Sequence, residues 1–300
     1  MNIIWQTIKS SENGILSDPT NGQYEYLTKV LFKNIEYTKY FDNEYSAHAP
    51  DCKTFLDNSI IIYACDTPEL SNQMKGYLQK YKELNLKYIL FHIGNESLNH
   101  NCDYYADAAY VFRFYYDNKI VGNVKTLPLG FVTGYMNEGG INLSDKRDID
   151  ISFIGQGTKN ERPSLINAIT TIDNKFLHLT RTWNCLTVMT VDKVIEIYKR
   201  TLFVPCPIGS VHPDTLRLFE ALEWGCIPIL RKYKGEDYFK NIFGEHPIPI
   251  VDEWTEIPSL IKELKPYADV LINSINGWYK NFMDLTVMEV TRIVNETFIL

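Results

Sequence analysis

The sequence lacks a long, uninterrupted hydrophobic run. Its first residues, 1–8, turn polar too soon to form a signal peptide or a membrane anchor. We therefore expect a cytoplasmic chain with no integral membrane segment, although a secretory-pathway enzyme without its anchor would have the same sequence features. Internal repeats and low-complexity tracts are also absent from the sequence.

Cysteine is scarce and unpatterned. The six cysteines form no Cys-x-x-Cys pair and have no spacing typical of zinc ligands. Cys65, Cys206 and Cys226 lie in or beside expected buried strands, where cysteine commonly acts as a small apolar residue. The cysteines therefore indicate a reducing compartment and predict no metal site.

The sequence has no excess of positive charge, since 30 Lys and Arg face 37 Asp and Glu, for a net charge of -7. This balance argues against nucleic acids, anionic membranes and polyanions as partners, because these require a basic surface. The length of 300 residues predicts about two domains. A hydrophobic share of 45% is enough to give each domain a core.

The first half of the chain predicts a strand-helix-strand unit with parallel strands. Its helix spans 68–84, with Asp66 or Thr67 as the N-cap. Residues 37–53 are polar and aromatic without a clear period, and they predict a loop or an insertion. The expected strands are Asn2–Trp5, Ser59–Tyr63 and Tyr88–His92.

The second half predicts alternating strands and helices after a glycine-rich, aperiodic stretch at 134–147, which is typical of a domain linker. This alternation favours a mostly parallel sheet with helices on both faces. The expected strands are 149–154, 175–179, 202–204, 227–230 and 248–251, and the expected helices are 162–170, 191–199, 236–243 and 257–264.

Residues 203–230 form the most informative segment. A short buried strand stops at two prolines, and Gly209 begins a turn. We expect Pro213 in the first turn of the following helix, with Asp214 at the positive end of its dipole. Gly225 ends that helix before the next strand. A strand, a turn and a helix N-terminus directed at one crevice are typical of phosphate binding in α/β proteins.

This segment resembles the C-terminal signature of exostosin-like glycosyltransferases, and its length and spacing make the match specific. Residues 91–96 and 127–131 look like N-terminal-domain landmarks of the same group. The matching residues are Cys206, Pro207, Gly209, Asp214, Arg217, Glu220, Ala221, Leu222, Gly225, Cys226, Ile227 and Pro228.

The resemblance implies an α/β chain of the GT-B class, with two Rossmann-like domains facing an interdomain cleft. Residues 1–135 would form the acceptor-side domain, 136–148 a linker and 149–274 the domain that binds the nucleotide sugar. Residues 275–300 would form a C-terminal helix that crosses back to the first domain.

The implied activity is inverting, metal-independent transfer of a sugar from a nucleotide sugar to a glycan or glycoconjugate acceptor. The donor would be a UDP-sugar such as UDP-xylose, and no other cofactor is expected. Two alternatives stay open at this point. The chain could be another GT-B nucleotide-sugar enzyme, such as an epimerase, or a catalytically silent glycan-binding module.

The donor-binding residues follow from the same resemblance. Glu220 matches the glutamate that accepts hydrogen bonds from the donor ribose, although it could instead pair with Arg217 on the helix surface. Arg162 follows the glycine-containing loop that starts at Gly155, and it either contacts phosphate or lies solvated in the first turn of a helix. Arg217 either reaches the diphosphate or braces Glu220.

The turn before the signature helix offers further donor-binding candidates: Gly209, Ser210, His212 and Asp214. A helix N-terminus with neutral donors would stabilise the negative charge that develops on a leaving nucleoside diphosphate. His212 could equally be a polar loop residue.

Inversion requires deprotonation of the acceptor hydroxyl by a general base. This base is expected from the N-terminal domain, because the acceptor enters on that side. Glu96 and His92 lie at or just beyond the end of a predicted parallel strand, the edge where α/β sites form. Glu96 is the first candidate and His92 the second, and Glu96 could also be a solvated loop residue. Asp148 and Asp150 form an Asp-x-Asp triplet that precedes a strand, and we interpret it as structural.

Overall fold

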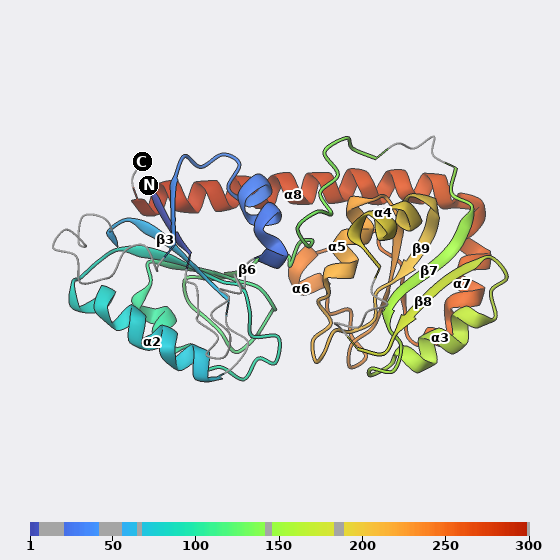
Figure 1. Cartoon of the computed structure of the whole chain (residues 1–300), viewed down its shortest axis with the longest axis horizontal. Coiled ribbons are helices and arrows are strands. Elements are labelled where there is room, and N and C mark those ends of the chain that lie inside the picture. The colour runs from blue at the N-terminus through green and yellow to red at the C-terminus, as the bar shows by residue number, and fades with distance from the viewer. Residues whose placement is uncertain (6–20, 42–55, 65–67, 142–145, 183–188, 299–300) are drawn as a thin grey trace. The chain divides into compact units, whose positions relative to one another are not determined.

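The computed structural model describes residues 1–5, 21–41, 56–64, 68–141, 146–182 and 189–298. These residues divide into two compact units (Figure 1). Unit 1 comprises Met1–Pro128 and Leu285–Leu300, and unit 2 comprises Leu129–Asp284.

Unit 1 is built on a six-stranded parallel sheet in the order β2-β1-β3-β4-β5-β6. Short helices and one long helix connect the strands. The strands are β1 (Asn2–Trp5), β2 (Thr38–Phe41), β3 (Ser59–Tyr63), β4 (Tyr88–His92), β5 (Tyr110–Arg113) and β6 (Val124–Thr126). The helices are η1 (Asn21–Gln23), η2 (Tyr26–Leu31), α2 (Pro68–Glu83) and η4 (Asp103–Asp107).

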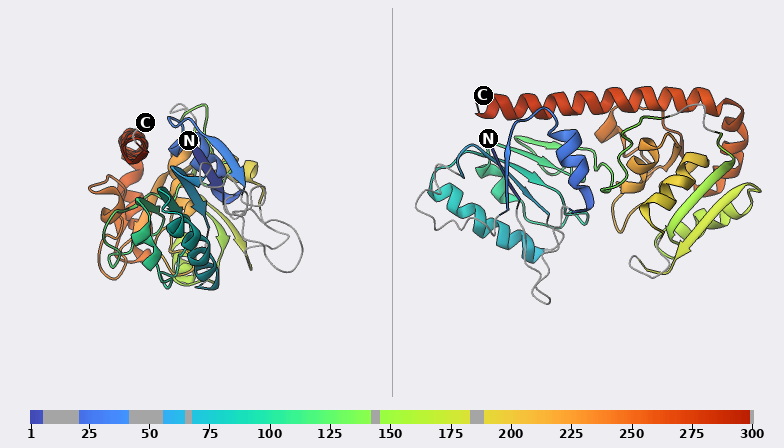
Figure 2. Two further views of the ribbon diagram at one scale, coloured as in Figure 1. Left: turned by 90° about the vertical axis from the view of Figure 1, so that its left-hand side faces the viewer. Right: turned by 45° about the horizontal axis from the view of Figure 1, so that its top comes forward.

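The two faces of this sheet are covered by different helices. Leu90 of β4 belongs to a buried cluster with Leu78 of α2 and Tyr105 of η4. The next residue, Phe91, packs its ring edge-on against Phe32, which follows η2. Successive side chains of a strand point to opposite faces, so α2 with η4 and the η2 region lie on opposite sides of the sheet (Figure 2).

Unit 2 is built on a five-stranded parallel sheet in the order β11-β10-β9-β7-β8. Its strands are β7 (Ile149–Gln156), β8 (Lys175–Thr180), β9 (Thr201–Pro205), β10 (Ile227–Arg231) and β11 (Ile250–Val251). Its helices are α3 (Arg162–Thr170), α4 (Val191–Arg200), α5 (Leu216–Glu223), α6 (Lys240–Phe243), η5 (Trp254–Glu256), α7 (Ile257–Leu264), η6 (Lys265–Tyr267) and α8 (Ala268–Phe298), whose last part belongs to unit 1.

The strands and helices expected from local pattern are mostly present. The three strands expected in the first half have the predicted bounds, and β3 and β4 pair in parallel on either side of α2. Helices α3 and α7 also have the predicted bounds. The proposed caps Asp66 and Thr67, and the part of the expected loop at 42–53, lie outside the described residues.

Two of the expected elements differ from the structure, one near each end of the chain. The start of the expected loop at 37–53 contains β2, which pairs with β1 at the edge of the sheet. The segment is too short for its periodicity to reveal a strand. The last helix begins at Ala268, before the expected residue 275, because η6 leads directly into it.

The boundary between the two units falls at Pro128–Leu129, upstream of the expected linker. The chain that follows is held by unit 2 itself. Trp224 Nε1 donates to the carbonyl of Tyr135 at 3.0 Å, and the Asn137 backbone N–H donates to a Glu223 carboxylate oxygen at 3.2 Å. Arg147 donates to the carbonyls of Tyr198, Thr201 and Trp224. Glycine content alone therefore does not make this stretch a free connector.

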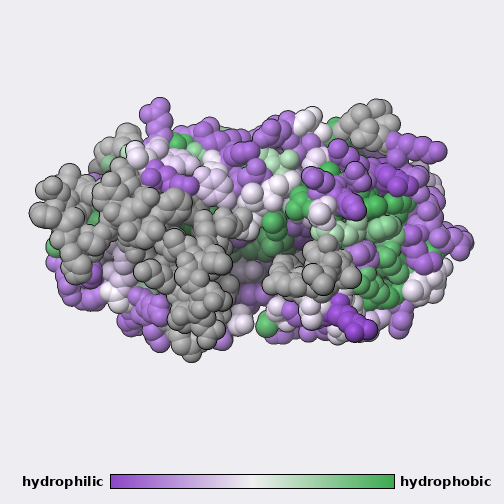
Figure 3. Space-filling view, viewed as in Figure 1, coloured by the Kyte–Doolittle hydropathy of each residue, from purple (hydrophilic) through white to green (hydrophobic). Residues whose placement is uncertain are grey.

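No helix in the described ranges is both long enough and apolar enough to cross a membrane. Apolar side chains do gather on the face of unit 2 that contains α4 and β7 (Figure 3). Leu179 of the neighbouring strand β8 is 45% exposed. Because β8 is the edge strand of this sheet, its residues are only partly covered by the described parts of the chain.

Candidate donor site in unit 2 and polar cluster in unit 1

The predicted donor-binding residues all lie in unit 2, near the end of β7, at the start of α3, on the segment after β9 and on α5. The strands β7 and β9 are parallel neighbours, so their carboxyl ends meet at one edge of the sheet. Glu96 and His92, the two base candidates, lie in unit 1.

Arg217 extends from α5 to the end of β7. Its Nη2 donates to the carbonyl of Ile154 at 2.8 Å, and its guanidinium carbon lies 4.7 Å from the centre of the Phe153 ring. Gly155 makes this approach possible, because a Cβ at that position would lie 2.8 Å from Arg217 Nη2. The backbone of Gly155 also has φ +142°, a conformation that favours glycine.

Glu220 lies on α5, three residues after Arg217, and is 9% exposed. Burial raises the pKa of its carboxyl to about 7, while the charge of Arg217 acts in the opposite direction. Burial, followed by the charge of Glu220, raises the pKa of Tyr198 and of Tyr135. The carboxylate is therefore a buried acceptor among aromatic rings and does not lie solvated on the helix surface.

Arg162 begins α3, and its guanidinium is directed at backbone carbonyls. It donates to the carbonyl of Gln156 at 3.1 Å and to that of Ile208 at 3.2 Å. It thereby ties the loop after β7 to the segment after β9. Its predicted contact with phosphate stays a prediction, and in this structure its role is to hold the two loops together.

Neighbours of Arg162 strengthen the same link. Glu161 accepts a hydrogen bond from the backbone N–H of Ile208 at 2.9 Å and forms an ion pair with Arg231. Asn160 donates to the carbonyls of Gly209 and Ser210 at 2.8 and 3.1 Å. Lys159 donates to the hydroxyl of Ser210. The expected residues Gly209 and Ser210 therefore lie beside basic and amide side chains that the sequence did not single out.

His212 and Asp214 are both buried, and both contact Tyr238, a residue that sequence reasoning missed. Tyr238 donates to Asp214 Oδ2 at 3.0 Å, and its oxygen lies 3.2 Å from His212 Nε2. Burial raises the pKa of Asp214 to about 7, and the hydrogen bond from Tyr238 acts in the opposite direction. Tyr238 lies in the expected helix 236–243, of which only α6 (Lys240–Phe243) is present, and no local pattern signals its contact with residues far back in the chain.

The helix that follows starts later than expected. Helix α5 begins at Leu216, and Thr215 is its N-cap, with an extended backbone at φ -138° and ψ 144°. Pro213 and Asp214 therefore precede the helix and do not form its first turn. The N–H of Asp214 is bonded to His212 Nδ1 at 3.3 Å, within the segment that precedes the helix. The side chain of Thr215 makes no capping hydrogen bond to the first turn of α5.

His92 and Glu96 differ in environment. His92 ends β4 and is fully buried, with Nδ1 2.5 Å from the hydroxyl of Tyr105 and its ring stacked on Tyr63. Glu96 lies in the loop beyond β4 and is partly exposed. Of the two candidates, Glu96 is the one that a substrate can reach without rearrangement of the core.

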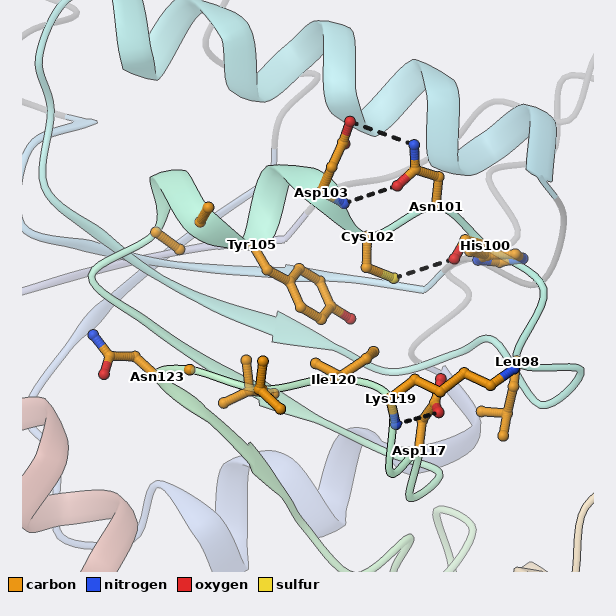
Figure 4. Close-up of a pocket in the computed structure, with 15 residues that line it drawn as sticks. Leu98, His100, Asn101, Cys102, Asp103, Tyr105, Asp117, Lys119, Ile120 and Asn123 are labelled. Atoms are coloured by element: carbon orange, nitrogen blue, oxygen red, sulfur yellow. Dashed lines mark hydrogen bonds between the residues drawn. The ribbon is translucent and has the colours of Figure 1, made fainter.

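Unit 1 contains a cavity of about 640 Å³ between η4 and the segment that leads into β6 (Figure 4). Tyr105 and Cys102 extend into it from the η4 side, and Asp117, Lys119 and Ile120 line the other side. The walls offer neutral donors together with the carboxylates of Asp103 and Asp117 and the ammonium group of Lys119. None of the sequence-predicted site residues lines this cavity.

Within the described ranges, no group of three or more His, Cys, Asp or Glu side chains could hold a metal ion. The Asp-x-Asp triplet has ordinary partners instead. Asp148 accepts two hydrogen bonds from Arg200, and Asp150 accepts one from Lys265 at 2.7 Å. Both carboxylates thus form ion pairs with basic side chains, and the structural interpretation of this triplet stays a prediction.

Comparisons with known proteins place the chain by its fold. No protein-family model and no curated protein sequence matches it. HepE of Anabaena, solved in complex with UDP and glucose, is similar over 99% of both chains, with a TM-score of 0.53 and 11% identity. HepE in complex with UDP-glucose has a TM-score of 0.51 at the same identity and coverage. TarM is similar over 81% of this chain and 56% of the TarM chain, with 10% identity and a TM-score of 0.49. The α/β fold of this chain is thus of the GT-B class, as the sequence predicted.

Proposed function

We propose that this chain is an inverting, metal-independent glycosyltransferase that uses a UDP-sugar, such as UDP-xylose, and a glycan or glycoconjugate acceptor. Two lines support the proposal. The fold is shared with HepE, whose structures contain UDP with glucose and UDP-glucose. The exostosin-like signature of residues 206–228 also lies on the loop, helix and strand where a GT-B protein of that type would hold its donor.

The observation that carries the proposal is the position of Glu220. Its carboxyl is buried on α5, the helix that follows the carboxyl end of β9, and the N-cap residue of that helix, Thr215, makes no capping hydrogen bond with its side chain. A carboxylate there can accept hydrogen bonds from ribose hydroxyls, while the helix N-terminus faces the phosphates. Burial raises the pKa of this carboxyl to about 7, and strongly shifted pKa values cluster at functional sites.

The proposed chemistry needs no metal ion. As the bond between the anomeric carbon and the UDP oxygen breaks, negative charge develops on the diphosphate. The dipole of α5 and the side chains of Ser210 and Lys159 would stabilise that charge. The acceptor hydroxyl loses its proton to the proposed base, Glu96, as its oxygen bonds to the opposite face of the anomeric carbon. The products are the inverted glycoside and UDP.

Isothermal titration with UDP in the presence of EDTA tests donor binding. We expect binding by the unmodified chain and weaker binding by Glu220→Gln. Glu263→Gln, which changes an exposed glutamate on α7, serves as the matched control and should bind as the unmodified chain does. Absence of UDP binding, or its loss on addition of EDTA, would contradict the proposal.

An assay of UDP release from UDP-sugars then separates the enzyme classes. A glycosyltransferase releases UDP in proportion to added acceptor. An epimerase of the same fold would convert the UDP-sugar without an acceptor, and a glycan-binding module would release nothing.

A further inference from the structure

Three buried side chains form one hydrogen-bonded group in unit 2. His212 and Asp214 precede α5, and Tyr238 lies in the connection between β10 and α6. Their exposed fractions are 5%, 3% and 8%. The hydroxyl of Tyr238 lies between the other two, 3.2 Å from His212 Nε2 and 3.0 Å from Asp214 Oδ2.

The pattern of donors assigns the protons of this group. The Asp214 backbone N–H donates to His212 Nδ1 at 3.3 Å, so Nδ1 is an acceptor and the imidazole proton lies on Nε2. Nε2–H then donates to the oxygen of Tyr238, and the hydroxyl proton of Tyr238 goes to Asp214 Oδ2. His212 Nδ1 and Asp214 Oδ2 are 3.6 Å apart, too far for a hydrogen bond. The group is therefore a neutral imidazole, a phenol and a carboxyl in a fixed order.

This group holds one side of the segment 208–215, which leads into α5. The other side is held from the loop after β7, where Glu161 binds the N–H of Ile208 and Asn160 binds the carbonyls of Gly209 and Ser210. On the first side, the hydroxyl of Tyr238 contacts two side chains of the segment, those of His212 and Asp214.

Asp214 depends strongly on that hydroxyl. Its second oxygen, Oδ1, has no hydrogen-bond partner among the described residues. A buried carboxyl with no hydrogen bond is costly, so loss of the hydroxyl would favour movement of Asp214 toward water. Asp214 adjoins Thr215, the N-cap of α5, and its movement would redirect the first N–H groups of the helix.

Resting on the proposed function, we propose that Tyr238 is a positioning residue for the diphosphate of the donor. Its hydroxyl fixes His212 and Asp214, and through them the backbone that presents N–H groups to the phosphates. Tyr238 itself touches neither the nucleoside nor the sugar in this assignment. Its loss should thus weaken binding of the diphosphate and spare that of the nucleoside.

Tyr238→Phe tests this with two ligands, UDP by isothermal titration and uridine by ligand-observed NMR. We expect Tyr238→Phe to bind UDP about tenfold more weakly, the loss associated with one hydrogen bond to a charged group, and to bind uridine unchanged. Tyr233→Phe is the matched control, because it removes a hydroxyl from the same connection outside this group, and it should bind UDP normally. In ¹⁵N NMR spectra of the unmodified chain, His212 should carry its proton on Nε2.

Equal UDP affinity in Tyr238→Phe and the unmodified chain would overturn the role of Tyr238 alone. Equal weakening of UDP and uridine would overturn it too, because it would indicate a general loss of structure. A proton on Nδ1 of His212 would overturn the assigned order of donors. Failure of the unmodified chain to bind UDP would instead overturn the proposed function itself.

Discussion

The guanidinium of Arg217 lies against Gly155, and it fits there because glycine has no side chain. A Cβ at position 155 would come within 2.8 Å of Arg217 Nη2. The same guanidinium bonds to the carbonyl of Ile154, so a helix residue is fixed to the end of β7. This contact joins α5, which carries Glu220, to the strand that precedes the α3 loop.

Gly155→Ala should lower the free energy of unfolding by about 1–3 kcal/mol, because alanine is strained at φ +142° and displaces Arg217. Urea denaturation measures the change. Gly277→Ala is the control, since Gly277 lies in α8 with no atom near its missing Cβ, and there alanine should be neutral or stabilise by up to about 1 kcal/mol. Equal effects of the two substitutions would contradict the proposed contact.

UDP affinity should depend on pH through Glu220. Burial raises its pKa to about 7 in the free protein, and the ionised carboxylate accepts stronger hydrogen bonds from ribose hydroxyls than the protonated carboxyl does. Affinity should therefore fall as pH drops below 7, by at most about tenfold per pH unit, and level off above pH 8. Titrations between pH 5.5 and 8.5 measure this dependence. In Glu220→Gln this pH dependence of the UDP affinity should disappear. An unchanged pH profile in that variant would exclude Glu220 as the source of the pH dependence.

The free energy of unfolding should decrease as pH rises from about 4.5 to above 7. Burial raises the pKa of Asp214 and of Glu220 to about 7, so in this range the folded chain holds protons that the unfolded chain has released. At pH 8 each carboxyl then lowers the free energy of unfolding by on the order of 3 kcal/mol, since one pKa unit corresponds to about 1.4 kcal/mol. Denaturation at pH 5.5 and pH 8 tests the sign, and Asp214→Asn should flatten the slope. Greater stability at pH 8 would show that these two groups do not dominate.

Glu96→Gln should lower turnover by about 10²–10⁴-fold and leave UDP affinity unchanged. A base acts only as the acceptor attacks, whereas the donor is held in unit 2 under the proposed function. Initial rates at saturating donor and titration with UDP provide the two readings. Unchanged turnover would leave His92 as the remaining candidate, although its ring is fully buried and bonded to Tyr105.

The regular elements could be predicted because their signals are local. The three expected strands of unit 1, helix α3 and helix α7 have the bounds that their apolar runs and prolines indicate. The short edge strand β2 and the start of α5 could not be placed, because each is decided by contacts from elsewhere. Strand β2 exists through its pairing with β1, and the extended backbone of Thr215 places the start of α5 at Leu216, after a segment whose side chains bond to Tyr238.

The sequence by itself determined the order of most strands and helices, since these depend on residue type and spacing along the chain. Its resemblance to exostosin-like glycosyltransferases implied the GT-B class and singled out the glutamate on the signature helix. The tertiary structure decided which of the candidate side chains are buried and what they bind. Arg162 and Arg217 bond to backbone carbonyls, Asp214 is held by a tyrosine from a different connection, and burial raises the pKa of Glu220. Such contacts join residues far apart in the chain, and desolvation depends on everything packed around a group, so neither is encoded in any local pattern.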